Sequence, residues 1–187
     1  MQKNNVLVIT ASPRTGGNSA LAAGYLTSII SPKSQISNVN INKLQFKACN
    51  ACDKCRDNLK CVFKDDAAAL IKKAERSDIV IIASPVYFTG VPGPLKTFID
   101  RNQVQWYKRY AKPAKSPKKK RGIIILTEGT NKDKYFKPAE SEIRSFFAVN
   151  NIKTAVVLKF KGMDEKGKIL KDKNALTRLK KAAQIFV

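Results

Sequence analysis

Short apolar segments alternate with amphipathic segments along the chain. Four continuous apolar segments, each rich in β-branched residues, span residues 6–10, 79–84, 122–127 and 154–160. A weaker fifth, residues 37–41, places Val39 and Ile41 between polar residues. Short apolar runs of this kind are typical of strands buried on both faces, as in a parallel sheet covered by helices on either side.

The segments between the apolar runs have the spacing of helices. Leu21, Tyr25 and Ile29 recur at intervals of four residues, and Asp65 and Asp66 are favourable N-terminal residues for another helix. We expect helices over residues 19–29, 66–76, 95–102, 139–149 and 174–186. The alternation of strand and helix predicts a doubly wound, three-layer α/β fold.

Two stretches interrupt this alternation. One is a cysteine-rich insert at about residues 47–64, and the other is a polar, proline-containing connection over residues 104–120. The sequence shows no internal repeat, and its 187 residues are the usual length of one domain. We therefore expect a single domain over residues 1–187.

The composition excludes several kinds of active site. The sequence contains no histidine, which excludes Ser/His and Cys/His nucleophile pairs, HExxH metal sites, histidine-ligated haem and Cys2His2 zinc fingers. Any chemistry must therefore come from cysteine, carboxylate, lysine or hydroxyl groups, or from something bound.

The charge balance is strongly basic, with 36 Lys and Arg against 14 Asp and Glu and a formal net charge of +22. Such a surface attracts anions, among them nucleic acid and acidic partner proteins. The lysines are spread over almost the whole chain, however, and they lack the interleaved aromatics of a single-strand binding groove. We interpret most of them as a solvated surface, and the densest run, residues 118–121, as a charged lead-in to a strand.

The lengths of the apolar segments also indicate the cellular compartment of the protein. Residues 6–10 are too short for the core of a signal peptide, and no run approaches the roughly 20 apolar residues that cross a bilayer. We expect a cytoplasmic protein without a membrane span. In that compartment disulfides are disfavoured, and clustered thiols more often hold metal.

The first strand-to-helix loop, residues 12–19, has the composition of a phosphate-binding loop. Its glycines permit close backbone approach, Arg14 supplies a cation, and the helix N-terminus that follows favours negative charge. It has neither the Gly-Lys-Ser/Thr of a Walker A loop nor GxGxxG. Taken alone, such a turn is more often only a helix cap. The candidate binding residues here are Ser12, Arg14, Thr15, Gly17, Asn18 and Ser19.

Two further loops follow later strands. Exposed aromatics beside glycines suit a flat ring, although Tyr87 and Phe88 would equally complete a core. The candidates in the second loop are Pro85, Val86, Tyr87, Phe88, Thr89, Gly90 and Val91, and in the third Thr127, Glu128 and Gly129. Because strand ends in a doubly wound sheet share one edge, the three loops together favour a mononucleotide, and flavin mononucleotide (FMN) is the best candidate.

The cysteines form a compact run, Cys49-x-x-Cys52-x-x-Cys55-x5-Cys61. Four thiolates in one loop can converge on an iron–sulfur cube, whereas zinc sites usually use two separated pairs. Incidental thiols, or the remnant of a lost cluster, are the alternatives. Basic residues around the loop would offset the charge of a thiolate-ligated cluster and raise its reduction potential; they are Lys47, Lys54, Arg56 and Lys60.

In combination these features resemble the iron-sulfur flavoprotein branch of the NADPH-dependent FMN reductase family. The matching pieces lie at residues 12–14, 17–19, 49–66, 84–88, 95–101 and 162–167. The resemblance implies a flavodoxin-like fold with strand order 2-1-3-4-5. It also implies an FMN phosphate held by Ser12, Arg14, Asn18 and Ser19, an isoalloxazine ring against residues 85–91, and a 4Fe–4S cluster on the four cysteines.

The resemblance also implies partners. Relatives form homodimers or homotetramers, and they take electrons from NAD(P)H or, in the cluster-bearing branch, from ferredoxin. Three residues depart from the family pattern. Phe88 stands where a Trp is common, Ala67 where a methionine follows the paired aspartates, and Glu128 in a loop that is usually neutral. We expect Glu128 to point to solvent.

Three functions are compatible with these residues. The first is an FMN-dependent oxidoreductase with a cluster, which exchanges electrons with a ferredoxin-like acidic carrier or NAD(P)H. The second is an NAD(P)H-dependent flavin or quinone reductase whose cysteine loop is empty. The third is a nucleic-acid-binding or regulatory module without turnover, and only the net charge of +22 supports it.

Overall fold

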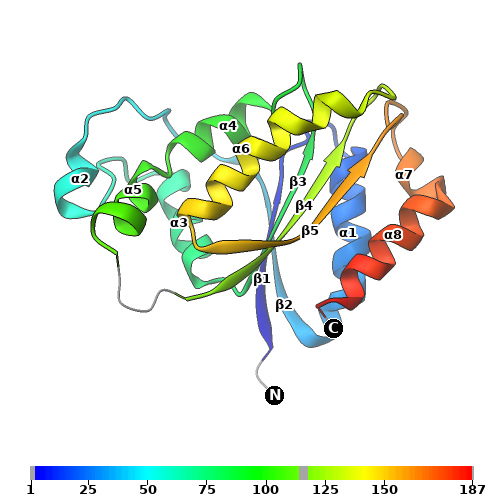
Figure 1. Ribbon diagram of the computed structural model, residues 1–187, viewed down its shortest axis with the longest axis horizontal. Helices are drawn as coiled ribbons and strands as arrows, with labels where there is room; N and C mark the ends of the chain where they lie inside the picture. The colour runs from blue at the N-terminus through cyan, green and yellow to red at the C-terminus, as the bar shows by residue number, and fades with distance from the viewer. Residues whose placement is uncertain (1–2, 114–117, 187) are drawn as a thin grey trace.

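A parallel sheet with helices on both faces forms the centre of the structure (Figure 1). The structure is a computed structural model, and it describes residues 3–113 and 118–186. In that part of the chain the sheet has five strands in the order β2-β1-β3-β4-β5. The strands are β1 (Asn4–Thr10), β2 (Ser34–Asn40), β3 (Ile79–Pro85), β4 (Lys120–Thr127) and β5 (Ile152–Phe160). All four strand pairs are parallel, which confirms the predicted doubly wound fold and its strand order.

The helices lie between the strands and after them. They are α1 (Asn18–Ile30), α2 (Lys54–Asn58), α3 (Asp66–Arg76), α4 (Gly93–Asp100), α5 (Gln103–Trp106), α6 (Phe136–Val149), α7 (Lys168–Lys171) and α8 (Lys173–Gln184). Short turns are η1 (Ser31–Lys33), η2 (Ile41–Lys43), η3 (Tyr107–Ala111) and η4 (Asp133–Tyr135). Helix α3 has the predicted bounds because the Asp65 carboxylate accepts the Ala68 N–H at 3.3 Å and caps the helix.

Two apolar cores lie on opposite faces of the sheet. Helices α3, α4 and α6 pack on one face, against alternate side chains of the central strands such as Leu7, Val80 and Ile124. Helices α1, α7 and α8 pack on the other, against side chains such as Val8 and Ile81. Each such side chain contributes about 1.5–3 kcal/mol when fully buried. The central strands are therefore apolar on both faces, as their continuous runs predicted.

Some boundaries differ from the prediction. Strand β2 runs from Ser34 to Asn40, three residues earlier than expected at its start, and α4 begins at Gly93 and ends at Asp100. The connection over residues 104–120 is partly helical, since it holds most of α5 and all of η3; residues 114–117 of it lie outside the described residues. The basic run does lead into a strand, because β4 begins at Lys120. Burial lowers the pKa of that lysine to about 8.

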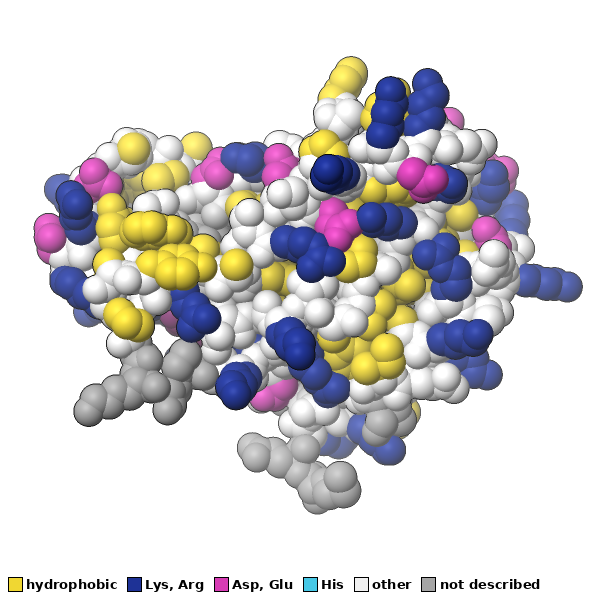
Figure 2. All heavy atoms as spheres, in the orientation of Figure 1, with side chains coloured by type: hydrophobic (Ala, Val, Ile, Leu, Met, Phe, Trp, Pro, Cys, Tyr) yellow, Lys and Arg dark blue, Asp and Glu magenta, His cyan; other side chains and the backbone are white. Residues whose placement is uncertain are grey.

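The surface is basic over much of its extent. Figure 2 shows lysine and arginine side chains distributed across the visible face, with acidic side chains interspersed among them. Among the residues that the structure describes, no helix has the length and apolarity needed to span a membrane.

Candidate functional site

A pocket of about 220 Å³ lies at the carboxyl ends of the sheet strands. Its walls come from the loops after β1, β3 and β4 and from the loop after β5. We call it the strand-end pocket. It is lined by Ser12, Arg14, Gly17, Asn18, Ser19, Pro85, Val86, Tyr87, Thr127, Gly129, Met163, Asp164 and Lys166. The structure thus brings together the three loops that the sequence singled out, at the edge where doubly wound folds bind ligands.

The turn after β1 is closed by one hydrogen bond between backbone groups and one to the Ser12 hydroxyl. The Ser12 Oγ accepts the N–H of Arg14 at 3.2 Å, and the N–H of Gly17 donates to the Arg14 carbonyl at 3.1 Å. A Cβ at Gly17 would lie 2.3 Å from Ser12 Oγ and 3.2 Å from the Arg14 carbonyl oxygen. Glycine is therefore required here by close approach of the loop to itself.

Helix α1 begins at this turn and presents an N-terminus suited to an anion. Its cap residue, Gly17, makes no side-chain hydrogen bond, and its first turn has no acidic residue. Ser19 is 1% exposed, and its Oγ has no hydrogen-bond partner among the described residues. A buried, unpaired hydroxyl costs about 1–3 kcal/mol, so its presence beside a helix N-terminus points to a ligand that would pair with it.

Asn18 connects this turn to the loop after β5. Its side-chain amide donates to the Met163 carbonyl at 2.9 Å and the Glu165 carbonyl at 2.8 Å, and its Oδ1 accepts the Ile169 N–H at 3.1 Å. Asn18 thus positions the loop, and the amide that we expected at a phosphate is already paired with backbone groups.

The loop after β5 adds residues to the site that the sequence does not predict to line it. Met163, Asp164 and Lys166 line the pocket, and Arg14 Nη1 donates to the Asp164 carbonyl at 3.3 Å. The Lys166 Cε lies 3.0 Å from where a Cβ of Gly16 would stand, so its side chain lies beside the turn after β1. The available signal was the 162–167 motif, with left-handed glycines at both ends.

In the first and third loops, two predicted residues do not line the pocket. Thr15 is exposed on the turn. Glu128, which we expected to point to solvent, is only 5% exposed, so that expectation was wrong. Its Oε1 accepts hydrogen bonds from the backbone N–H and the hydroxyl of Thr130, while Oε2 has no partner in the described part of the chain. The carboxylate folds back and closes the turn after β4.

The loop after β3 projects aromatic side chains from the sheet edge. Tyr87 and Gly90 exchange backbone hydrogen bonds of 2.9 and 3.0 Å, and Phe88 and Thr89 between them have positive φ angles of 46° and 69°. The tip therefore carries Phe88 fully into solvent, and Tyr87 is 39% exposed. These aromatics do not complete the core. Pro85, Val86 and Tyr87 line the pocket, whereas Phe88, Thr89, Gly90 and Val91 lie outside its lining.

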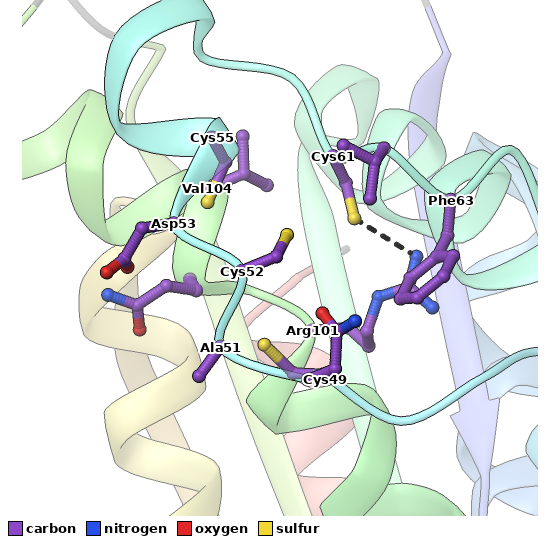
Figure 3. Close-up of a pocket in the computed structure, with 12 residues that line it drawn as sticks. Cys49, Ala51, Cys52, Asp53, Cys55, Cys61, Phe63, Arg101 and Val104 are labelled. Atoms are coloured by element: carbon purple, nitrogen blue, oxygen red, sulfur yellow. Dashed lines mark hydrogen bonds between the residues drawn. The ribbon is translucent and has the colours of Figure 1, made fainter.

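The cysteine loop, residues 47–64, forms a second pocket beside α5 (Figure 3). Cys49 and Cys52 are exposed, Cys55 and Cys61 are partly buried, and all four line the pocket. Burial raises the pKa of the Cys55 thiol, and the other cysteines add to the effect. Within residues 3–113 and 118–186, no three His, Cys, Asp or Glu side chains are grouped so that they could hold a metal ion.

The loop is held by the segment that follows α4. The Tyr107 hydroxyl donates to Asp53 Oδ1 at 3.2 Å, and Lys112 Nζ donates to the Asp57 carbonyl at 2.9 Å. Left-handed backbone at Ala51, Asp53 and Leu59 turns the loop around its pocket. The strand-end pocket and this pocket share no lining residue in the described structure.

Comparisons with known proteins agree with this architecture. A family model described as NADPH-dependent FMN reductase matches residues 4–154. An iron-sulfur flavoprotein of Archaeoglobus fulgidus is 37% identical over 94 residues, which are 50% of this chain and 43% of that protein. One of Methanocaldococcus jannaschii is 29% identical over 151 residues, 79% of this chain and 72% of its own. The chain spans about half the length of the first curated relatives it matches, since the matched part is 43% to 54% of three iron-sulfur flavoproteins.

Solved structures share the fold at low sequence identity. The NAD(P)H:quinone oxidoreductase from Methanothermobacter marburgensis superposes with a TM-score of 0.71 at 15% identity, covering 97% of this chain and 98% of that one. An FMN-dependent NADH-azoreductase from Bacillus anthracis, in complex with FMN, gives 0.69 at 14% identity over 97% and 98%.

Proposed function

Because this chain belongs to the NADPH-dependent FMN reductase family, we propose that it is a flavin-dependent oxidoreductase with FMN in the strand-end pocket and a 4Fe–4S cluster on the cysteine loop. The observation that carries the proposal is the buried hydroxyl of Ser19, which has no partner in the described structure, at a helix N-terminus without a side-chain cap. A phosphate group is the ligand that satisfies both features. The relatives named iron-sulfur flavoproteins support the second half of the proposal.

The residues of the strand-end pocket fit FMN in two parts. Ser12, Ser19 and the first backbone N–H groups of α1 would hold the phosphate, with Arg14 and Lys166 as cations beside it. Pro85, Val86 and Tyr87 would face the flat ring, and Thr127 and Gly129 its polar edge. In this arrangement Asn18, Glu128 and Thr130 position the loops rather than the ligand.

The cysteine loop fits a cluster better than a single ion. A 4Fe–4S cluster takes one thiolate at each of four irons, so its ligands need not converge on one point. Four thiols around one pocket, with a buried arginine that donates to one of them, match that donor set. Cys49, Cys52, Cys55 and Cys61 would be the ligands.

The chemistry would belong chiefly to the bound groups. FMN accepts a hydride or two electrons and releases them singly, and an iron–sulfur cluster transfers one electron at a time. The chain's own part would be to bind, orient and shield them. We propose one domain without a side-chain nucleophile, which agrees with the absence of histidine from the sequence.

The test is purification without oxygen, followed by a visible spectrum and assays of iron and sulfide. The proposal expects about one FMN and about four irons per chain. Flavin with negligible iron would support the alternative, an NAD(P)H-dependent flavin or quinone reductase. Colourless protein that takes up no FMN would refute both. It would favour the nucleic-acid-binding alternative, which then requires duplex affinity above that of a generic polycation at physiological salt.

We also propose that copies of the chain assemble into a homodimer or homotetramer. The two pockets share no described residue, and α4, about 12 Å long, separates along the chain the loop after β3 from the residues of α5 that line the cysteine pocket. Exposed aromatic side chains at Phe88, Trp106 and Tyr110 are available for contacts between copies. Sedimentation of the purified protein measures the assembly directly.

If the electron donor is an acidic carrier such as ferredoxin, reduction of the chain should depend on salt. The formal charge of +22 steers an acidic partner at low ionic strength, and salt screens that attraction. We expect the second-order rate constant to fall several-fold or more between about 20 mM and 500 mM salt, measured by stopped-flow absorbance. Reduction by a small uncharged donor is the control. A rate for the acidic carrier that is indifferent to salt would contradict the proposal.

A further inference from the structure

Arg101 is a charged side chain buried completely beside the cysteine loop. It follows the last residue of α4, and its side chain has no exposed surface. A buried guanidinium is destabilising unless its N–H donors are paired, so the role of Arg101 can be inferred from the groups that its donors contact.

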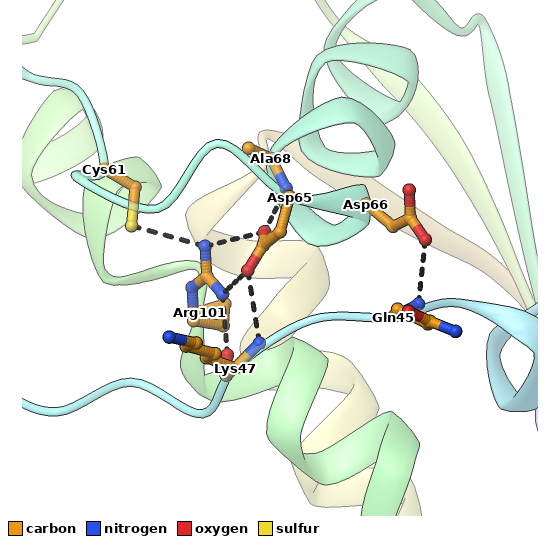
Figure 4. A network of polar contacts seen from close by, with 7 residues as sticks. All are labelled: Gln45, Lys47, Cys61, Asp65, Asp66, Ala68 and Arg101. Carbon is orange, nitrogen blue, oxygen red and sulfur yellow. Dashed lines mark hydrogen bonds and ion pairs between the residues drawn. The ribbon is translucent and has the colours of Figure 1, made fainter.

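Most of those contacts fix the guanidinium in place (Figure 4). Its Nη1 and Nη2 donate to the two carboxylate oxygens of Asp65 at 2.7 and 3.0 Å, a bidentate pair, and Nη1 also donates to the Lys47 carbonyl at 2.6 Å. Asp65 is itself held by the N–H groups of Lys47 at 3.2 Å and Ala68 at 3.3 Å. Burial raises the pKa of Asp65, but the hydrogen bonds from Arg101, Lys47 and Ala68 outweigh that effect and the pKa is lowered.

The remaining contacts lead to the cysteine loop. Arg101 Nη2 lies 3.4 Å from Cys61 Sγ, within hydrogen-bond distance for sulfur. The guanidinium carbon lies 4.9 Å from the centre of the Phe63 ring, which covers it from the side of the same loop. Its buried Nε has no partner among the described residues. Asp65 and Lys47 therefore aim one N–H of a locked fork at a single one of the four thiols.

From this geometry we propose that Arg101 is a positioning residue that donates a charge-assisted hydrogen bond to the Cys61 thiolate in the cluster-bound protein and thereby raises the cluster's reduction potential. This rests on the proposed function, because it requires the cluster on the cysteine loop. A cation that donates to a ligand sulfur stabilises the more negative, reduced state of the cluster over the oxidised state.

A purely structural role would not need this arrangement. Asp65 could be satisfied by any donor pair, whereas only a planar fork with several N–H groups reaches two carboxylate oxygens, a carbonyl and a sulfur together. Lysine keeps the positive charge but cannot make all four contacts. Arg101→Lys therefore separates the hydrogen bond to Cys61 from the presence of a cation.

The experiment is an anaerobic redox titration of the reconstituted protein, with the reduced cluster followed by electron paramagnetic resonance and the flavin by absorbance. For Arg101→Lys we expect the ratio of reduced to oxidised cluster, at a fixed solution potential, to fall about tenfold, the effect of losing one charge-assisted hydrogen bond. The reduction potential of the flavin should not change. Arg109→Lys, which replaces an exposed guanidinium on η3, should move neither couple.

A second measurement needs no stable variant at position 101. Protein grown with ¹⁵N-arginine and reduced by one electron should show a ¹⁵N coupling to the cluster in pulsed paramagnetic resonance, and labelled Arg56→Lys should keep it. An unchanged cluster ratio in Arg101→Lys, or no coupling in the labelled protein, would overturn the inference while leaving the cluster itself intact. A wild-type chain that takes up no iron would overturn both this inference and the proposed cluster.

Discussion

Replacing Gly17 by alanine is expected to weaken FMN binding about a hundredfold. The new Cβ would stand 2.3 Å from Ser12 Oγ and 3.2 Å from the Arg14 carbonyl oxygen. Relief requires Ser12 to leave its position, which breaks the hydrogen bond that its Oγ accepts from Arg14 and removes the hydroxyl from the phosphate site. Loss of a hydrogen bond to a charged group, about 1.5–3 kcal/mol, together with the displaced turn accounts for this factor. Titration of FMN-free protein, followed by quenching of flavin fluorescence, measures it.

Gly24→Ala is the matched control for this substitution. Gly24 lies within α1, and a Cβ there would meet no heavy atom within 4 Å. Because alanine favours the helix interior by roughly 0.5–1 kcal/mol over glycine, this variant should be slightly more stable and bind FMN as the wild type does. Equal affinity of the Gly17→Ala and Gly24→Ala variants would contradict the assignment of the turn after β1 to the phosphate.

The fold could be predicted because local pattern and tertiary arrangement agree. The central strands are apolar on both faces, so their runs are visible without knowledge of their neighbours. Errors came where local signals compete. The helix expected over residues 95–102 begins two residues earlier, at Gly93, because proline is tolerated in the first turn and α4 therefore includes Pro94.

The segment after α4 was predicted as a connection because its sequence is polar and contains prolines. Its helical turns are stabilised by ring contacts within the segment and by a hydrogen bond to a distant residue. Trp106 packs against Tyr107 and Tyr110, with ring centres 5.3 and 5.6 Å apart, and the Tyr107 hydroxyl pairs with Asp53 of the cysteine loop. No local pattern encodes a partner 54 residues away.

The sequence predicted which loops form the candidate site, but not the hydrogen bonds that join these loops to distant segments. Strand ends share an edge, so the loops after β1, β3 and β4 could be grouped from the sequence alone. The pairing of Asn18 with Met163 and Glu165, and that of Arg101 with Asp65 and Cys61, depend on segments far apart in the chain. Glu128 was expected to point to solvent because glutamate side chains are mostly exposed. It is buried instead, and its carboxylate accepts hydrogen bonds from Thr130.

Ser19→Ala is expected to move stability and FMN affinity in opposite directions. Without ligand the Ser19 hydroxyl is buried and lacks a partner in the described structure, so its removal should raise the free energy of unfolding of FMN-free protein by about 1 kcal/mol. With ligand the same hydroxyl would donate to the phosphate, so FMN affinity should fall about tenfold. Urea unfolding and fluorescence titration of the same preparation measure the two effects.

Ser34→Ala distinguishes this trade-off from a general effect of removing a buried hydroxyl. The Ser34 Oγ, at the start of β2, is also buried and likewise without a partner in the described structure, but it does not line the strand-end pocket. Its removal should give a similar gain in stability and no change in FMN affinity. If Ser19→Ala binds FMN as tightly as Ser34→Ala, then Ser19 is not a phosphate ligand, and its unpaired hydroxyl does not mark the cofactor site. If Ser19→Ala instead weakens binding while both variants become more stable, the Ser19 hydroxyl raises FMN affinity and lowers the stability of the FMN-free protein.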